Sequence, residues 1–385
     1  SDVYKRQGVN DQRYTTRYGV DWQQDNKVFG IDNIAQAEFD TGPLSHTAIV
    51  GLDYYHFNSK FNGLYDYNPP IIDLFNPVYG QPLHFGNNYR WDNTITQTGL
   101  YAQDQIKLDK WIFVLGGRYD WAETNNKQPL SNARTDSKNE KFTGRGGIVY
   151  LFDNGVAPFV SYSESFLPLT GTNAQGSAFD PSTGKQYEAG VKYQPPGQNS
   201  FVQVSAYELE QKNILTTDLG NPGFSNQTGA IRSKGVELEA KAELTEAFSV
   251  IASASRNDIK YTKDNDGRKG RHPAGNPPLT AALWLNYVVL GETPLAGLGA
   301  GVGARYARSN YGDDYEGAFQ IPSYTVYDAS LTYDLGLSVF RLKGLKMALN
   351  VKNLADKEYV SSCISQWDCY YGEGRTVVSS VTYNW

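Results

Sequence analysis

The sequence has no long run of apolar residues of the kind that a membrane-spanning helix needs. Such a helix takes about 18 or more consecutive apolar residues, whereas the longest apolar stretch, Ala281–Leu290, is short and is interrupted by Asn286. This excludes a helical membrane protein. It does not exclude a membrane barrel, because only alternate residues of a barrel strand face lipid and the mean hydropathy, here −0.51, stays low. A soluble β-protein could share this composition.

Cysteine, histidine and positive charge are also scarce. Two cysteines are too few for a disulfide-dense scaffold or a four-ligand zinc site. The net charge is −6 and no basic stripe is present, which argues against nucleic acid as a partner. The four histidines are scattered without metal-ligand spacing, and no Ser-His-Asp or paired-carboxylate arrangement can be argued. We therefore expect neither an enzyme nor a chain with its own metal or cofactor.

Aromatic residues and two-residue alternation are abundant. Aromatics make up 14% of the chain, and tyrosine and tryptophan are typical of the two interface girdles of a membrane barrel. In Val236–Leu244 every even position is apolar and every odd position charged, so a strand there has one apolar face and one ionic face. Counting such segments predicts roughly 16 strands, each near or above the length that a tilted strand needs to cross a membrane.

The links between these segments alternate in length without a break. The short ones are Thr41–Ser45, Asp109–Lys110, Asp153–Gly155, Pro195–Asn199, Leu244–Glu246, Gly291–Leu295 and Gly336–Gly344. The long ones are Lys60–Trp91, Ala122–Glu140, Phe166–Gly184, Asn213–Gly229, Lys263–Gly275, Asn310–Ala318 and Ala355–Gly374. Outer-membrane barrels have tight periplasmic turns and long extracellular loops, whereas a soluble sandwich has no reason to sort its loops in this way. The sequence therefore predicts an all-β, antiparallel, up-and-down transmembrane β-barrel in outer-membrane lipid.

The two ends of the chain carry separate signals. Val381, Tyr383 and Trp385 share one face of the last segment, which resembles the aromatic C-terminal signature that the barrel-assembly machinery reads. At the other end no signal peptide is present, and Ser1–Gln7 does not continue the pattern that follows. We expect a non-native leader over residues 1–7 and one partial barrel domain over residues 8–385. Because a barrel must be secreted, we expect the chain to be truncated at its start.

From about Gln97 to Trp385 the sequence resembles the TonB-dependent siderophore receptors, closest to their ferrichrome/hydroxamate branch. The matching stretches are Gly99–Asp104, Leu115–Asp120, Tyr150–Gly155, Phe159–Phe166, Gly184–Tyr193, Ser233–Glu239 and Val351–Val360. The resemblance implies a 22-stranded barrel of the Gram-negative cell outer membrane, closed around an N-terminal plug that follows a TonB box. Plug, box and about six strands are expected to be missing from the residues given.

The function that this resemblance implies is uptake of a ferric siderophore, energised by the TonB-ExbB-ExbD complex. The iron arrives already coordinated, so the protein needs no metal ligands of its own. Another cargo, such as cobalamin or a glycan, stays open as an alternative, and so does a passive porin. A barrel enzyme, such as an outer-membrane phospholipase or protease, is disfavoured because no catalytic site can be argued.

Two cysteines lie in the last long link, with the spacing C-x5-C. Cys363 and Cys369 have no histidine nearby, and an oxidising cell surface favours a disulfide over a metal pair. Similar receptors of the ferrichrome branch carry such a pair in the same loop. They usually have an aromatic residue directly after the first cysteine, where this sequence has Ile364. The disulfide either shapes a ligand-facing loop or acts as a plain structural staple.

Aromatic residues in the long links are the candidate ligand contacts. A siderophore complex is bulky and has an apolar outer surface, which suits aromatic walls in a concave mouth. Packing within the loops or membership of an interface girdle is the alternative. The candidates, with the residue that follows the first cysteine included, are Tyr65, Tyr67, Phe75, Tyr79, Trp91, Ile364, Trp367, Tyr370 and Tyr371. Gly299, Gly301 and Gly303 alternate on one strand face and predict close backbone approach inside the barrel.

Overall fold

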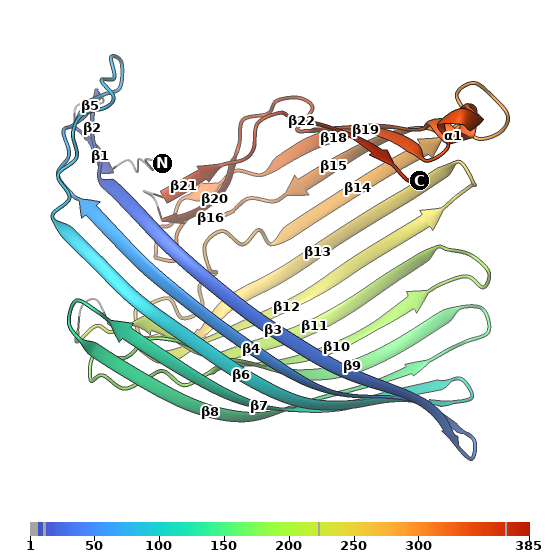
Figure 1. Ribbon diagram of the computed structural model, residues 1–385, viewed down its shortest axis with the longest axis horizontal. Helices are drawn as coiled ribbons and strands as arrows, with labels where there is room; N and C mark the ends of the chain where they lie inside the picture. The colour runs from blue at the N-terminus through green and yellow to red at the C-terminus, as the bar shows by residue number, and fades with distance from the viewer. Residues whose placement is uncertain (1–6, 11–12, 222–223, 366–367) are drawn as a thin grey trace.

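One curved antiparallel sheet of fifteen strands makes up most of the molecule (Figure 1). The computed structural model describes residues 7–10, 13–221, 224–365 and 368–385. The strands of the sheet are β3 (Gly19–Thr41), β4 (Leu44–Asp66), β6 (Asn87–Leu108), β7 (Trp111–Gln128), β8 (Ala133–Tyr150), β9 (Val156–Leu167), β10 (Ser182–Tyr193), β11 (Phe201–Thr217), β12 (Ser225–Glu243), β13 (Phe248–Lys263), β14 (Leu279–Val288), β15 (Leu298–Ala307), β18 (Tyr324–Asp334), β19 (Leu345–Lys352) and β22 (Thr376–Tyr383). Each strand pairs with the neighbours that precede and follow it in the sheet, as expected of an up-and-down barrel.

The sheet bends round, with β3 and β22 at its two edges (Figure 1). Within the described residues these two edge strands do not pair with each other. The predicted fold class is confirmed, and the fifteen strands of the sheet compare with the roughly 16 expected. No helix in the described part of the chain is long and apolar enough to cross a membrane.

Three small sheets and two short helices lie outside the main sheet in the described part of the chain. Within the described residues these elements are β1 (Gln7–Asn10), β2 (Tyr14–Thr16), β5 (Ile72–Asp73), β16 (Asn310–Tyr311), β17 (Gln320–Ile321), β20 (Val360–Ser365), β21 (Asp368–Tyr371), the helix α1 (Leu335–Ser338) and the 3-10 helix η1 (Phe340–Leu342). Residues 1–6 of the expected leader lie outside the described residues, so that division of the chain stays a prediction.

The predicted alternation gives the sheet two different faces. On β7 Trp111, Leu115 and Trp121 share the outward face and are exposed, so aromatic rings stand at both ends of an apolar band. On β12 Val236 and Leu238 lie on the same outward face, while Glu237 between them faces the other way. An apolar band with aromatic rims on the outside and polar residues on the inside is the pattern of a lipid-embedded barrel.

The long strands correct part of the loop assignment. We expected Ala122–Glu140 to be a long loop, but β7 and β8 continue through most of it and leave only residues 129–132 as a turn. The cause is that the backbone ladder continues beyond the apolar band, where both faces of a strand are polar. There Lys138 pairs with Glu123 at 2.6 Å, and both side chains are well exposed. Sequence patterns find a strand by its apolar face, so they miss such an extension.

The expected close approach inside the barrel occurs at the glycines of β15. A Cβ at Gly303 would lie 2.2 Å from Cε3 of Trp284, and one at Gly301 would lie 2.6 Å from Cζ2 of the same ring. Trp284 and Gly303 are direct partners on β14 and β15. The alternating glycines therefore make room for one indole against the inner wall of the sheet.

Candidate ligand-binding site

Six aromatic side chains gather where β3, β4 and β6 reach the end of the sheet that carries the long loops. Their strand positions follow from the register. Phe61 is paired with Trp91, Gly63 with both Trp22 and Tyr89, and the odd positions of β4 continue down to Asp53 on the same face. We call this group the aromatic patch, and its members are Trp22, Phe61, Tyr65, Tyr67, Tyr89 and Trp91.

The rings of the aromatic patch contact one another in a continuous chain. Phe61 stacks on Trp91 with centroids 5.1 Å apart and meets Trp22 edge-on at 6.0 Å. Tyr65 stacks on Tyr67 at 5.6 Å and meets Tyr89 at 5.0 Å in a T-shaped contact. Such pairs add about 0.5–1.5 kcal/mol each beyond the area that they bury. The patch is thus a rigid apolar surface on a strand scaffold.

Gly63 is part of the reason that these rings fit together. A Cβ at this position would lie 2.7 Å from Cε1 of Phe61 and 3.1 Å from Cε2 of Tyr65. Both rings lean over the glycine from the flanking positions on the same face of β4. A side chain at position 63 would push them apart, so this glycine has a packing role.

Asp66 fastens the loop that rises beside the aromatic patch. Its carboxylate accepts hydrogen bonds from the backbone N–H of His84 at 2.7 Å and of Asn68 at 3.0 Å. These two bonds hold the pKa of the buried Asp66 carboxyl below its ordinary value of 3.8. The loop of residues 67–86 is therefore tied at both ends to the top of β4.

The hydroxyl of Tyr67 points to the hydroxyl of Tyr89, with 3.5 Å between the two oxygens. This hydrogen bond raises the pKa of Tyr67 to about 12. The phenol of Tyr67 is thus neutral at physiological pH and adds no charge to the patch. An uncharged aromatic surface suits a ligand whose exterior is apolar.

The candidates predicted from the sequence divide into two groups. Tyr65, Tyr67 and Trp91 are brought together in the aromatic patch. Phe75 and Tyr79 are 79% and 67% exposed and take part in no ring–ring contact among the described residues. The contacts of the first three rings are structural findings, and a role in ligand binding stays a prediction for all five.

The remaining candidates belong to the β20–β21 hairpin. Tyr370 and Tyr371 lie on β21 and are exposed, Tyr371 at 79%. Ile364 is part of β20, and Trp367 lies outside the described residues. The predicted disulfide between Cys363 and Cys369 is present and joins the two strands of the hairpin at directly paired positions.

Trp22, Phe61 and Tyr89 belong to the patch but were not among the predicted candidates. Phe61 and Tyr89 lie in the long link Lys60–Trp91 that supplied candidates, whereas Trp22 was missed altogether. It lies within β3 rather than in a long link, and the candidates came from the links. The available signal was a large aromatic residue among polar neighbours on a strand, Asp21, Gln23 and Gln24. Such a residue on the polar face of a barrel strand has no lipid to contact and needs another apolar partner.

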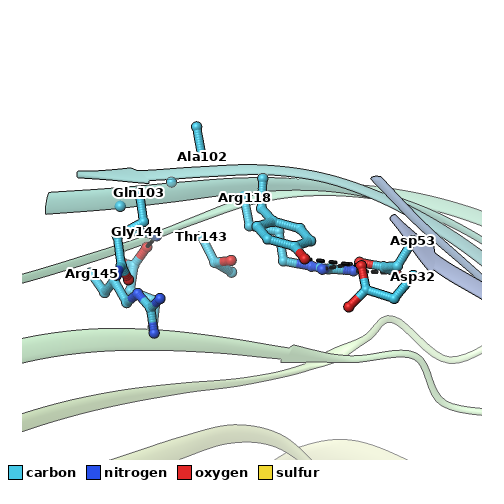
Figure 2. A pocket seen from close by; sticks show the side chains of 12 residues that line it. Asp32, Asp53, Ala102, Gln103, Arg118, Thr143, Gly144 and Arg145 are labelled. Atoms are coloured by element: carbon cyan, nitrogen blue, oxygen red, sulfur yellow. Dashed lines mark hydrogen bonds and ion pairs between the residues drawn. The ribbon is translucent and has the colours of Figure 1, made fainter. Parts of the chain in front are cut away.

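A charged cluster lies further down the same inner face, in a cavity of about 400 Å³ (Figure 2). The guanidinium of Arg118 donates to Asp53, with one bond of 2.9 Å, and to Asp120 at 2.6 Å. Close by, Tyr101 donates its hydroxyl to Asp32 at 2.9 Å. In Figure 2 the side chains of Arg118, Asp53 and Asp32 lie on one side of the sheet, while Ala102 points to the opposite side.

This arrangement makes Arg118 a structural residue of the inner wall. Its charge is shared between two carboxylates, one of which, on Asp120, is only 3% exposed. Gly99 lies beneath the guanidinium, where a Cβ would come within 1.9 Å of Nη2. Within the described residues no group of three or more His, Cys, Asp or Glu side chains could hold a metal ion. The inner face thus combines a polar wall with an apolar, uncharged patch above it.

The fold and this inner face define an outer-membrane β-barrel receptor. The family described as "TonB dependent receptor-like, beta-barrel" matches residues 1–354. The chain belongs to this family, whose members are receptors and transporters of the Gram-negative outer membrane rather than enzymes.

Curated relatives agree with this assignment. The chain is 40% identical over 378 residues to the ferrichrome outer membrane transporter/phage receptor of Escherichia coli, covering 95% of this chain and 49% of that protein. It is 38% identical over 384 residues to the ferrioxamine B receptor of Salmonella typhimurium, covering 100% of this chain and 54% of that protein. The chain thus spans about half the length of these relatives.

Solved structures show the same fold. The siderophore receptor PiuA from Acinetobacter baumannii superposes with a TM-score of 0.79 at 23% identity, over 97% of this chain and 58% of that one. The unliganded ferric citrate transporter FecA superposes with a TM-score of 0.72 at 17% identity, over 99% of this chain and 56% of that one. At these identities the likeness concerns the fold alone.

Proposed function

We propose that this protein is an outer-membrane receptor and active transporter for a ferric siderophore of the hydroxamate type. The observation that carries the proposal is the aromatic patch, which lies on the inner face of the sheet at the end that carries the long loops. The names of the relatives from Escherichia coli and Salmonella typhimurium support a hydroxamate cargo.

The chemistry of the cargo matches the chemistry of the patch. In a ferric siderophore the ligand oxygens already surround the iron, so the exterior of the complex is bulky and largely apolar. Aromatic rings held rigid on strands bury such a surface with little loss of conformational freedom. The cargo then needs no protein ligand for its iron, and no covalent step takes place. The contacts that we assign to it are those of Trp22, Phe61 and Trp91.

Release of the cargo towards the periplasm requires an energy source. We propose the TonB-ExbB-ExbD complex as the partner, acting through a plug domain, because the family to which the barrel belongs is named for that dependence. Binding at the mouth would shift the receptor towards the conformation that the partner recognises. The barrel-assembly machinery is the partner proposed for Val381, Tyr383 and Trp385, which lie at the exposed C-terminal end.

Growth on defined iron sources tests the proposal. The protein is expressed from its own gene in a Gram-negative host without other siderophore receptors, and ferric hydroxamates are supplied as the sole iron source. Growth that depends on both the gene and TonB supports the proposal. Growth without TonB would indicate a passive porin. Failure on every ferric siderophore would favour another cargo, such as cobalamin or a glycan.

A further inference from the structure

Three segments that lie far apart in the sequence meet at the end of the sheet that carries the long loops. They are the loop of residues 264–278 after β13, the loop of residues 308–323 after β15, and the hairpin of β20 and β21. The second loop contains β16 and β17, and Figure 1 shows β16, β20 and β21 gathered in one place. We call the three segments together the mouth wall.

A largely buried arginine joins the first loop to the second. Arg268 pairs with Asp264 of its own loop at 2.9 Å and with Asp314 of the other loop at 3.7 Å. Its guanidinium also lies over the ring of Tyr261, 5.0 Å from the centroid. The side chain of Arg268 is only 15% exposed and that of Asp264 is fully buried, so water and salt screen these charges little. We call the group of Tyr261, Asp264, Arg268 and Asp314 the clasp.

Each carboxylate of the clasp has its own set of donors. Asp264 accepts a hydrogen bond from the backbone N–H of Arg268 at 2.9 Å. Burial works to raise the pKa of Asp264, but hydrogen bonds, chiefly from the backbone and guanidinium of Arg268, outweigh burial and hold the pKa below its ordinary value of 3.8. Asp314 accepts from the hydroxyl of Tyr261 at 2.7 Å and from the backbone N–H of Ala274. The carboxylates that the clasp buries are therefore paired and hydrogen-bonded, as a stabilising buried ion cluster requires.

Backbone and side-chain contacts outside the clasp also join the two loops. The N–H of Gly275 donates to the carbonyl of Tyr311 at 3.0 Å, and the ring of His272 stacks on that of Tyr311 with centroids 5.7 Å apart. Tyr315 donates its hydroxyl to Asp266 at 2.8 Å. The two loops are thus joined along much of their length.

The disulfide-bonded hairpin packs against both loops. A Cβ at Gly275 would lie 3.4 Å from the backbone oxygen of Cys363, so the first loop runs along β20 in van der Waals contact. The strand β17 of the second loop contacts β20 as well, and Ile321 on β17 is buried. Cys363 itself is fully buried. A displacement of the hairpin would therefore disturb both loops.

We propose that the mouth wall is one conformational unit held by the clasp, and that its three segments open together. Opening any one segment would uncover the buried charges of the clasp or the buried side chains along β20. Partial opening therefore loses nearly as many contacts as complete opening, which is the condition for a cooperative unit. The inference does not depend on the identity of the cargo. In a receptor, such a unit gives the barrel mouth one preassembled side.

Hydrogen exchange tests the proposal without any cargo, on the protein purified from the outer membrane after expression from its own gene. The variant Arg268→Met removes the cation of the clasp, and Tyr261→Phe removes only the hydroxyl that Asp314 accepts. Tyr261→Phe keeps the ring, so it keeps the test valid if Arg268→Met fails to fold. Arg271→Met is the matched control, because Arg271 also pairs with the second loop, 2.9 Å from Glu316, but the side chain of Glu316 is 90% exposed.

Arg268→Met should speed exchange at least about tenfold in all three segments of the mouth wall, because hydrogen bonds to buried charged groups are lost. Tyr261→Phe should speed it roughly three- to tenfold in the same three segments. Arg271→Met should change exchange in none of them by more than about twofold. Faster exchange confined to residues 264–278 in the clasp variants would overturn the single unit, as would unchanged exchange in both. An effect of Arg271→Met as large as that of Arg268→Met would show that the clasp is not what joins the loops.

Discussion

The ring of Phe61 stacks on the ring of Trp91, with centroids 5.1 Å apart and planes 10° from parallel, on two neighbouring strands that pair at these very positions. The contact is long-range in sequence but fixed by the register of one antiparallel ladder. Trp22 joins it from the third strand. The binding surface that we propose is therefore a property of the sheet and its register.

The inner wall should tolerate a larger residue at Gly303 only if Trp284 is removed. Gly303→Val places carbon atoms where the indole now lies, and overpacking of this kind costs about 1–3 kcal/mol. Unfolding of the purified barrel in denaturant measures the loss. The double variant with Trp284→Ala should recover part of it, and Ala300→Val on the outward face serves as the control. Additive effects of the two changes would contradict the contact.

Arg118 should matter more to stability than an exposed ion pair of similar geometry. Arg118→Met leaves the carboxylates of Asp53 and Asp120 without their shared cation, and Asp120 is 3% exposed. Removing one partner of a buried pair costs about 3–5 kcal/mol, and the partial exposure of Arg118 reduces our expectation to about 2 kcal/mol. Lys138→Met, which breaks a well-exposed pair with Glu123, should change the stability much less. Equal losses in the same unfolding assay would show that the cluster is not structural.

Acid should loosen the loop of residues 67–86 through Asp66. The pKa of Asp66 is lowered in the folded state. Its contribution to the stability of the folded loop is therefore complete above the ordinary pKa of 3.8, and it is lost as the pH falls through the lower pKa of the folded state. Hydrogen exchange of the loop amides, corrected for the intrinsic pH dependence, should therefore accelerate below about pH 4. In Asp66→Asn the exchange should be faster at neutral pH and should lack this acid step. Identical pH profiles of hydrogen exchange for the wild type and Asp66→Asn would show that Asp66 does not hold the loop in place.

The hairpin of β20 and β21 should depend on its disulfide, and the barrel should not. Titration under denaturing, non-reducing conditions is expected to find no free thiol, because Cys363 and Cys369 are joined. Replacing both by serine removes a cross-link worth roughly 2–3 kcal/mol to so short a loop. Exchange in residues 360–371 should rise while that of β22 stays unchanged. Loss of the whole barrel in this variant would contradict a local role.

The sequence predicted the fold well because a lipid-facing band imposes alternation on every strand. Val236 and Leu238 could be assigned to a face from their spacing alone. The upper halves of β7 and β8 could not, since no apolar face marks a strand outside the membrane. The same reason hid Trp22, whose neighbours on β3 are polar. Which residues of two strands pair, as Phe61 pairs with Trp91, depends on turn lengths across the whole hairpin and cannot be read from the local sequence.

The candidate site was predicted only in part. The chemistry of the long links pointed to aromatic residues, and the structure gathers Tyr65, Tyr67 and Trp91 with three further rings. It leaves Phe75 and Tyr79 exposed, because they lie in the loop beyond the end of β4. Composition identifies the kind of side chain that a bulky apolar cargo needs, while the ladder of β3, β4 and β6 decides which of them meet.

Binding of a ferric trihydroxamate to the wild type and to Phe61→Ala tests the central claim most directly. Phe61 touches two other rings of the aromatic patch, so its removal should weaken binding about 10- to 100-fold, as expected for truncation of a central aromatic contact. The exposed Phe75 serves as the control, and Phe75→Ala should bind as the wild type does. A wild type that binds the complex tightly, with Phe61→Ala unchanged and Phe75→Ala impaired, would place the cargo on the loop and contradict the site proposed on the strands.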